Sequence, residues 1–311
     1  MVKKHNPIYI LILTSLIVSL AAACNSGGPS VTATGKSTAT QLQTPEATGT
    51  QTISPPTATP VPMALTVNGE GIPLAEYQAQ MSQYQAALQE TKATPPPEAD
   101  QKQTVLNSLI SEALLAQAAR DAGYTTSDDE LQSRITQLEA SNGGASGLAD
   151  WEKQNGYTEL SFKDALARSM AAAWQRDQIV SQVPTTADQV HARQILVNTQ
   201  AEAQNILNQL DAGADFATLA YYYNSNTGGD LGWFPRGYLT IPAVEDAAFA
   251  LKPGEYSAII QSKLGFHIIQ VIERDPNHPL SADARLILQN QALQKWVADR
   301  LAQSKVTVLV P

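Results

Sequence analysis

The stretch Gly228-Gly229-Asp230-Leu231-Gly232-Trp233-Phe234-Pro235-Arg236-Gly237 decides the fold of this chain. Paired glycines ahead of an acidic residue, then a short apolar run, then Pro and Gly, predict a turn, a strand and a second turn. Two further segments follow, Glu245–Leu251 (EDAAFAL) and Gly265–Ile269 (GFHII). The turn-strand-turn pattern alone indicates only part of a domain that mixes helices and strands. The order of the three segments along the chain is much more specific for one kind of fold.

The sequence around these segments alternates between helical and extended patterns. Strands mixed with helices, ending in a hairpin, predict a small α+β domain. We expect, in chain order, a strand at 190–197, helices at about 200–210 and 216–222, a strand at 229–234, a helix at 243–251, and strands at 259–261 and 266–272.

The ordered series GGDLGWF, RG, EDAAFAL, PGE and GFHII resembles the parvulin-type peptidyl-prolyl isomerases, especially secreted foldases of the PrsA and SurA kind. The resemblance is close over residues 186–275 and loose over residues 63–182. It implies a four-stranded antiparallel sheet wrapped by helices, and peptidyl-prolyl cis-trans isomerase activity. This reaction uses no metal or cofactor. It lowers a barrier near 20 kcal/mol by gripping proline and favouring the twisted amide.

The resemblance also implies a catalytic set of two histidines with an Asp or Cys, of which this chain keeps part. The histidine of GFHII is His267, and a retained hydroxyl near it is Ser262. The second family histidine corresponds to Gln194, and the best match to the Asp or Cys is Asn226. His191 does not replace the missing histidine, because three residues along a strand place it on the opposite face. We therefore expect weak activity.

The implied proline pocket is also altered. Leu231 of GGDLG is kept, Leu239 stands where the family has Met, and Val244 stands where it has Phe. A lone histidine such as His267 in an apolar strand is more often a hydrogen-bonded core residue than a functional one. Because the surrounding motif matches the family, a structural role and a catalytic role both stay open for His267.

The N-terminus has the order of a bacterial lipoprotein signal. Lys3 and Lys4 precede an apolar run at 8–20, three alanines, and Cys24. The run is too short to favour a membrane-spanning helix. We expect a signal peptide at 1–23 and a lipidated Cys24 that holds the protein on the membrane. The alternative is an ordinary signal peptide followed by a chance cysteine. Residues 24–62, rich in Ser, Thr and Pro, predict a disordered tether.

The sequence pattern of residues 63–182 predicts an all-helical unit with one small strand. Apolar residues recur three and four positions apart, and Ser127 with Glu130 has the spacing of a capping box. The unit resembles the N-terminal chaperone module of SurA-type foldases. In relatives, a terminal helix like the one at 281–304 packs back on this module, so we expect residues 281–311 to do so and residues 186–275 to be an insertion.

Composition narrows the functions further. The 311 residues carry a formal net charge of -9, so no electrostatic case exists for binding nucleic acid. The chain has a single Cys, so it forms no internal disulfide. Its four His and this Cys are not spaced along the sequence as zinc ligands are. We expect an extracytoplasmic, lipid-anchored foldase on the bacterial cell membrane that isomerises X-Pro bonds of unfolded or partly folded exported polypeptides. The alternative is a non-catalytic holdase chaperone that binds unfolded or Pro-containing segments.

Overall fold

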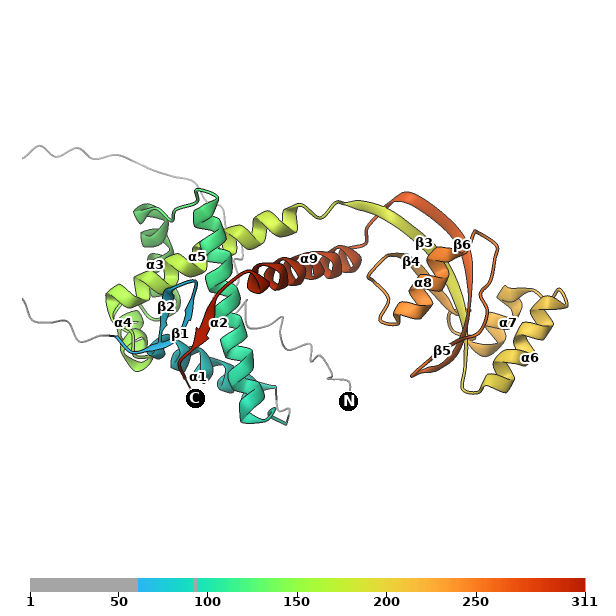
Figure 1. Cartoon of the computed structure of the whole chain (residues 1–311), viewed down its shortest axis with the longest axis horizontal. Coiled ribbons are helices and arrows are strands. Elements are labelled where there is room, and N and C mark those ends of the chain that lie inside the picture. The colour runs from blue at the N-terminus through green and yellow to red at the C-terminus, as the bar shows by residue number, and fades with distance from the viewer. Residues whose placement is uncertain (1–60, 92–93, 311) are drawn as a thin grey trace, which may run out of the picture. The chain divides into compact units, whose positions relative to one another are not determined.

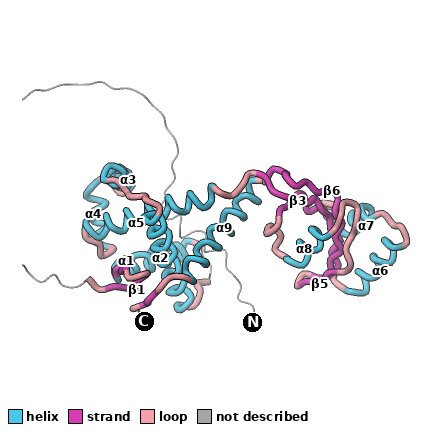
Figure 2. Tube along the Cα trace, turned by 45° about the horizontal axis from the view of Figure 1, so that its top comes forward, coloured by secondary structure: helices cyan, strands magenta, loops and turns pink. Residues whose placement is uncertain are grey.

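The structure is a computed structural model that describes residues 61–91 and 94–310. The expected signal peptide, Cys24 and nearly all of the tether lie outside the described residues. Figures 1 and 2 show the elements. In chain order they are β1 (Met63–Val67), β2 (Glu70–Pro73), α1 (Leu74–Glu90), α2 (Glu98–Asp121), α3 (Asp128–Ser141), α4 (Ala145–Gln154), α5 (Glu159–Ser181), β3 (Thr186–Val197), α6 (Gln200–Asp211), α7 (Phe216–Tyr223), β4 (Asp230–Pro235), α8 (Pro242–Ala250), β5 (Ile260–Ser262), β6 (Gly265–Pro279), α9 (Ala282–Ala302) and β7 (Val306–Val308).

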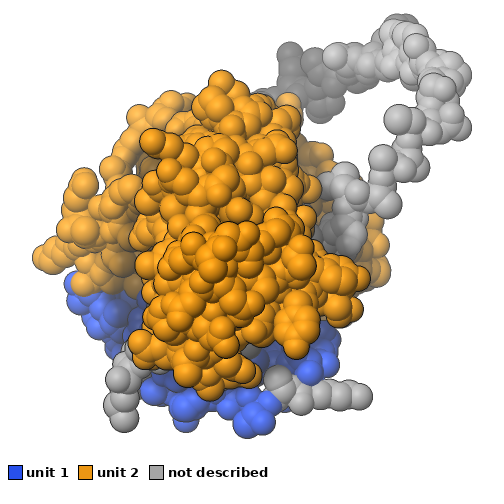
Figure 3. All heavy atoms as spheres, turned by 90° about the vertical axis from the view of Figure 1, so that its right-hand side faces the viewer, with its two compact units in different colours: residues 1–66, 70–109, 307–311 blue, residues 67–69, 110–306 orange. Residues whose placement is uncertain are grey.

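Contacts divide the chain into two compact units (Figure 3). The first unit takes the chain through Thr66, then Glu70–Leu109, and then everything from Thr307 onward. The second unit takes Val67–Gly69 and Ile110–Val306. The division therefore falls inside the long helix α2, whereas the sequence suggested boundaries on either side of the parvulin-like segment.

The first unit is built around α1 and the strand β1. On α1 the buried side chains include Tyr77, Tyr84 and Leu88, which are seven and four positions apart and so share one face of the helix. The last residues return to β1, where the Leu309 N–H donates to the Ala64 carbonyl at 2.8 Å. The strand order β2-β1-β7 shows that Val306–Val308 adds a third strand to this small sheet.

A tight turn joins β1 to β2. Asn68 has a φ of 53° and Gly69 a φ of 89°, both left-handed. Asn and Gly tolerate this region better than other residues, and the Asn-Gly pair is typical of a two-residue hairpin. The Asn68-Gly69 pair thus forms the hairpin turn between the two strands.

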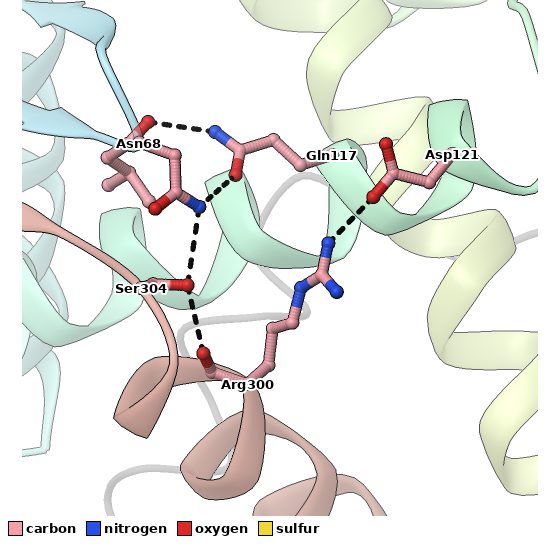
Figure 4. A network of polar contacts seen from close by, with 6 residues as sticks. Asn68, Gln117, Asp121, Arg300 and Ser304 are labelled. Atoms are coloured by element: carbon pink, nitrogen blue, oxygen red, sulfur yellow. Dashed lines mark hydrogen bonds and ion pairs between the residues drawn. The ribbon is translucent and has the colours of Figure 1, made fainter.

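A polar network fixes that turn inside the second unit (Figure 4). The Asn68 side-chain amide donates to Gln117 on α2 at 2.8 Å and to Ser304 at 3.2 Å. Close by, Arg300 on α9 forms an ion pair with Asp121 at 2.7 Å. The network thus links the turn, the end of α2 and the end of α9 through paired polar groups.

Helices α3 and α5 each begin at a capping box. Ser127 and Glu130 exchange side-chain and backbone hydrogen bonds at the start of α3, as their spacing predicted. Thr158 and Ser161 do the same for α5, with Thr158 as its N-cap. These caps satisfy N–H groups that the first turn of a helix leaves unpaired.

Helix α9 packs against α5 and the second half of α2. Leu293 and Trp296 of α9 lie against a cluster that includes Leu115, Ala119 and Ile179. Small alanines on α2 and α5 let the larger side chains of α9 approach closely. The amphipathic pattern at 281–304 therefore buries its apolar stripe on the helices, and the final helix begins with Ser281 as its N-cap.

The sheet of the parvulin-like segment has four antiparallel strands in the order β4-β3-β6-β5, as expected. Its central pair is longer than predicted, because β3 and β6 remain paired as far as Thr186 opposite Pro279. Proline ordinarily interrupts a ladder, but along this end β6 has β3 on one side while β5 pairs only with Gly265–His267. The missing N–H of Pro276 then costs little at a free edge.

Each face of this sheet carries its own core. Ala192, Ile269 and Val271 pack with α8 on one face. Ile195 and Ile268 pack with α6 and α7 on the other. Alternation along β3 and β6 thus sends neighbouring residues into different cores, and it decides which face receives His267.

Candidate active site

His267 lies on the α8 face of β6. It is 1% exposed and alternates with Phe266 and Ile268, which point to the opposite core. The GFHII segment therefore places one imidazole in an otherwise apolar strand face, beside Ile269. A polar ring buried this deeply requires hydrogen-bond partners.

Both ring nitrogens have a partner. Nε2 lies 2.7 Å from the Ser262 Oγ, and Nδ1 lies 2.9 Å from the Gln194 Oε1. The Ser262 Oγ also accepts the Leu264 N–H at 3.0 Å. The simplest arrangement for a neutral ring has Nδ1–H donating to Gln194 and Nε2 accepting the hydroxyl proton of Ser262. Three of the four predicted catalytic residues thus form one continuous chain of hydrogen bonds.

Burial lowers the pKa of His267 below the usual value for histidine. Removing the imidazolium from water disfavours the charged form, and the partners Ser262 and Gln194 are both neutral. The ring therefore stays uncharged near neutral pH, and the site is a neutral hydrogen-bonding surface.

The three predicted pocket residues gather in one apolar cluster around Phe234 and Phe249. Leu231 and Leu239 are partly exposed, whereas Val244 is only 3% exposed. Leu231 and Leu239 thus lie at the partly exposed side of the cluster, and Val244 is buried within it.

Sequence reasoning missed the role of Glu245, which is 8% exposed. Its carboxylate accepts the N–H of Gly237 at 2.8 Å and the N–H of Leu239 at 3.0 Å. These bonds fix the loop that carries Leu239. The sequence carried no clear signal for this contact, because successive residues of a helix point in directions about 100° apart.

The structure does not bring Asn226 into this chain of hydrogen bonds. Asn226 is exposed in the segment after α7, and among the described residues no hydrogen bond joins it to His267 or Gln194. Its neighbour Gly229 does reach the site, since the Gln194 N–H donates to the Gly229 carbonyl at 2.8 Å. A Cβ at Gly229 would clash with the Gln194 carbonyl oxygen, so glycine is required there.

His191 lies on the other face of β3 from Gln194, as the strand period predicted. Its Nε2 lies 2.9 Å from the Asp230 Oδ1, and its ring lies 5.6 Å from that of Trp233. Trp233 in turn stacks on His278 at 4.0 Å. His191 therefore belongs to a separate, aromatic cluster.

Two family models match the chain. Residues 178–275 match the PPIC-type PPIASE domain, and residues 58–157 match the SurA-like N-terminal domain. The first match contains the whole His267 chain of hydrogen bonds.

Curated relatives match over a longer span. The foldase protein PrsA of Caldanaerobacter subterraneus is 30% identical over 232 residues, which are 66% of this chain and 71% of that protein. The chain belongs to the PrsA family of foldases. It therefore carries a peptidyl-prolyl cis-trans isomerase domain of the parvulin type behind a SurA-like helical region, as the resemblance implied. The chaperone SurA of Nitrosospira multiformis is 44% identical over 105 residues, 30% of this chain and only 24% of SurA.

Among solved structures, the peptidylprolyl isomerase PrsA of Bacillus anthracis aligns with a TM-score of 0.41 at 25% identity, covering 64% of this chain and 96% of that one. Within the part of the chain that the structure describes, no group of three or more His, Cys, Asp or Glu is placed to hold a metal ion. No described helix has the length and apolar character needed to cross a membrane.

Proposed function

We propose that the chain of hydrogen bonds from Ser262 through His267 to Gln194 is the catalytic centre for isomerisation of X-Pro bonds. Leu231 and Leu239 grip the proline ring from the side of the apolar cluster. The observation that carries this assignment is the 1% exposed imidazole with a partner on each nitrogen, on the sheet face whose apolar cluster includes two partly exposed leucines.

The chemistry required is modest. Rotation about the X-Pro bond breaks amide resonance but transfers no proton to the protein. A neutral, buried set of hydrogen bonds offers fixed dipoles near the twisting amide, and the leucines hold the ring while the preceding residue turns. Glu245 supports the pocket by fixing the Leu239 loop.

We assign Asn226 a weaker role in the same proposal. It is exposed in the segment between α7 and Gly229, and in this proposal it meets the substrate backbone directly. We therefore expect weak rather than absent turnover.

The protein acts on unfolded or partly folded exported polypeptides in this proposal, and it is held on the bacterial membrane through lipid on Cys24. Support comes from the order of the first 24 residues and from the foldase and chaperone names of the relatives. Residues 63–182 with 281–311 form the chaperone-like module, and residues 186–275 are inserted in it. Fractionation of cells expressing wild type and Cys24→Ser tests the anchor. Equal membrane retention without acyl mass on either protein would exclude it.

A holdase is the second candidate. It is favoured by Gln194 in place of a histidine and by the position of Asn226 outside the chain of hydrogen bonds. A holdase would bind Pro-containing segments without speeding their isomerisation.

A protease-coupled assay with short proline peptides separates the two. The full chain should accelerate cis-trans exchange measurably above the uncatalysed rate. Binding of the same peptides without any acceleration would reject the isomerase and leave the holdase.

A further inference from the structure

The loop that carries the pocket residue Leu239 is held by two different helices. From α8, the Glu245 carboxylate accepts the N–H groups of Gly237 and Leu239 at 2.8 and 3.0 Å. From α9, the side-chain amide of Gln291 donates to the Gly237 carbonyl at 2.6 Å. Gln291 lies outside residues 186–275, so a helix that is not part of the parvulin-like segment reaches the proline pocket through this one contact.

Helix α9 holds Gln291 on the side that faces away from the helices on which α9 packs. Two residues earlier, Gln289 donates to the Val180 carbonyl near the end of α5 at 3.3 Å. Two residues later, Leu293 packs against the cluster formed by α2 and α5. Successive residues of a helix point about 100° apart, so Gln291 points about 200° away from both of these neighbours. The neighbours anchor the helix, and Gln291 is left free to serve the loop.

The backbone of the loop is shaped to receive this amide. Gly237 has a φ of 84°, in the left-handed region that favours glycine. A Cβ at this position would lie 2.6 Å from the Gln291 Oε1. The missing side chain therefore permits both the turn of the loop and the close approach of Gln291 to the Gly237 carbonyl.

We propose that Gln291 is a positioning residue for the proline pocket, an inference that rests on the proposed isomerase function. The N–H of Gly237 belongs to the peptide group before it and the carbonyl to the peptide group after it. Glu245 fixes the first group and Gln291 fixes the second, so the backbone leading to Leu239 has one orientation. Without the bond from α9, the second peptide group is free to rotate, and Leu239 meets the proline ring less often in the right place.

The test uses the full chain with three substitutions at Gln291. Gln291→Met has no donor, Gln291→Glu sets a carboxylate against the Gly237 carbonyl, and Gln291→Lys keeps a donor. In the protease-coupled assay, the KM for a proline peptide should rise about threefold to fivefold in the Met variant and further in the Glu variant. It should stay within about twofold of wild type in the Lys variant. Gln294→Met, an exposed position one turn later on α9, is the matched control and should leave KM unchanged.

The division between KM and kcat separates positioning from a general loss of structure. A grip that acts equally on the ground state and the transition state raises KM and leaves kcat unchanged when it is weakened. Partial unfolding would instead lower the active fraction, so that kcat falls at constant KM. That second result, or an unchanged KM in both Gln291→Met and Gln291→Glu, would overturn the inference.

Hydrogen exchange separates this inference from the proposed function. If wild type does not accelerate isomerisation at all, the isomerase assignment fails, and the exchange rates then decide on the loop alone. The N–H groups of Gly237 and Leu239 should exchange faster in Gln291→Met than in wild type, while the N–H of Ile269 in the buried strand β6 should not change. Equal exchange of the loop in the two proteins would reject the positioning role.

Discussion

His267 on β6 and His191 on β3 lie on opposite faces of one sheet, and their surroundings differ in every respect. His267 is buried between a hydroxyl and an amide, both neutral. His191 is half-buried and faces the carboxylate of Asp230 and the ring of Trp233. The contrast shows that the surroundings of a histidine in a strand depend on the face of the sheet to which its side chain points. A shift of one residue along the strand moves a side chain to the other face.

The first and largest effect should come from the pocket on the His267 face. Leu239→Asp places a carboxylate in the apolar cluster beside Phe234, where an unpaired charge is strongly disfavoured. We expect turnover of proline peptides to fall about a hundredfold or more in the protease-coupled assay. Leu264→Ala, which shortens a 63% exposed side chain at the β5–β6 turn, should change it little. A folded Leu239→Asp protein with normal turnover would remove Leu239 from the pocket.

Val244→Asp should act through stability. Because Val244 is 3% exposed, the charge would lie in the core rather than at its surface. Thermal unfolding is expected to show a large loss of stability, and the variant is therefore no clean test of the pocket.

The second effect compares the two histidines directly. His267→Ala removes the centre of the chain of hydrogen bonds and should lower kcat by roughly tenfold to a hundredfold. His191→Ala, on the other face, should leave kcat within about twofold of wild type. Equal losses in both variants, with unchanged circular dichroism, would show that the two faces do not differ in catalysis.

The third prediction concerns pH and sharpens the same contrast. The pKa of His267 is lowered in the folded state by burial, whereas in the unfolded chain it is ordinary, about 6.5. Between these two values the unfolded state binds more protons, so the free energy of unfolding must decrease as pH falls from about 6.5 toward the folded pKa. The contribution is complete above about pH 7. Melting temperatures at pH 7.5 and 5.5 should therefore differ more for wild type than for His267→Gln. Identical differences would mean that His267 is not buried in its neutral form.

Much of this fold follows from residue pattern alone. The four-stranded sheet was expected from the resemblance to the parvulin family, and the Asn68-Gly69 turn and the capping box at Ser127 are each specified by local chemistry within a few residues. The extra length of β3 and β6 is not, because the pairing that keeps Pro276 in a strand involves residues about ninety positions away. The side chain of Gln189 on β3 strengthens this pairing, because its amide donates hydrogen bonds to the carbonyls of His278 and Pro279 on β6.

The candidate site also has features that could be predicted from the sequence and features that could not. Alternation along β3 suffices to put Gln194 and His191 on opposite faces, whereas the pairing of β3 with β6 brings Gln194 to the face of His267. Alternation does not reveal that Glu245 holds the Leu239 loop, since that contact depends on how α8 turns over the sheet. Nor does it reveal that Asn226 stays in solvent, because the course of a glycine-rich loop is set by close approaches such as Gly229 to Gln194.

The smallest effect is expected from restoring the family residues. Gln194→His with Asn226→Asp should raise turnover a few-fold, because an ionisable pair would polarise the proline amide more strongly than two amides do. The geometry separates the two positions. Gln194 contacts His267 at 2.9 Å, so Gln194→His alone should give most of the gain, whereas Asn226→Asp alone lies outside the hydrogen bonds and should change little. The single and double variants are compared by kcat/KM at pH 6.5 and 8, since only the histidine variants should respond to pH. A flat response in a folded double variant would mean that these positions are not the altered catalytic pair, and that the neutral chain from Ser262 to Gln194 is already sufficient.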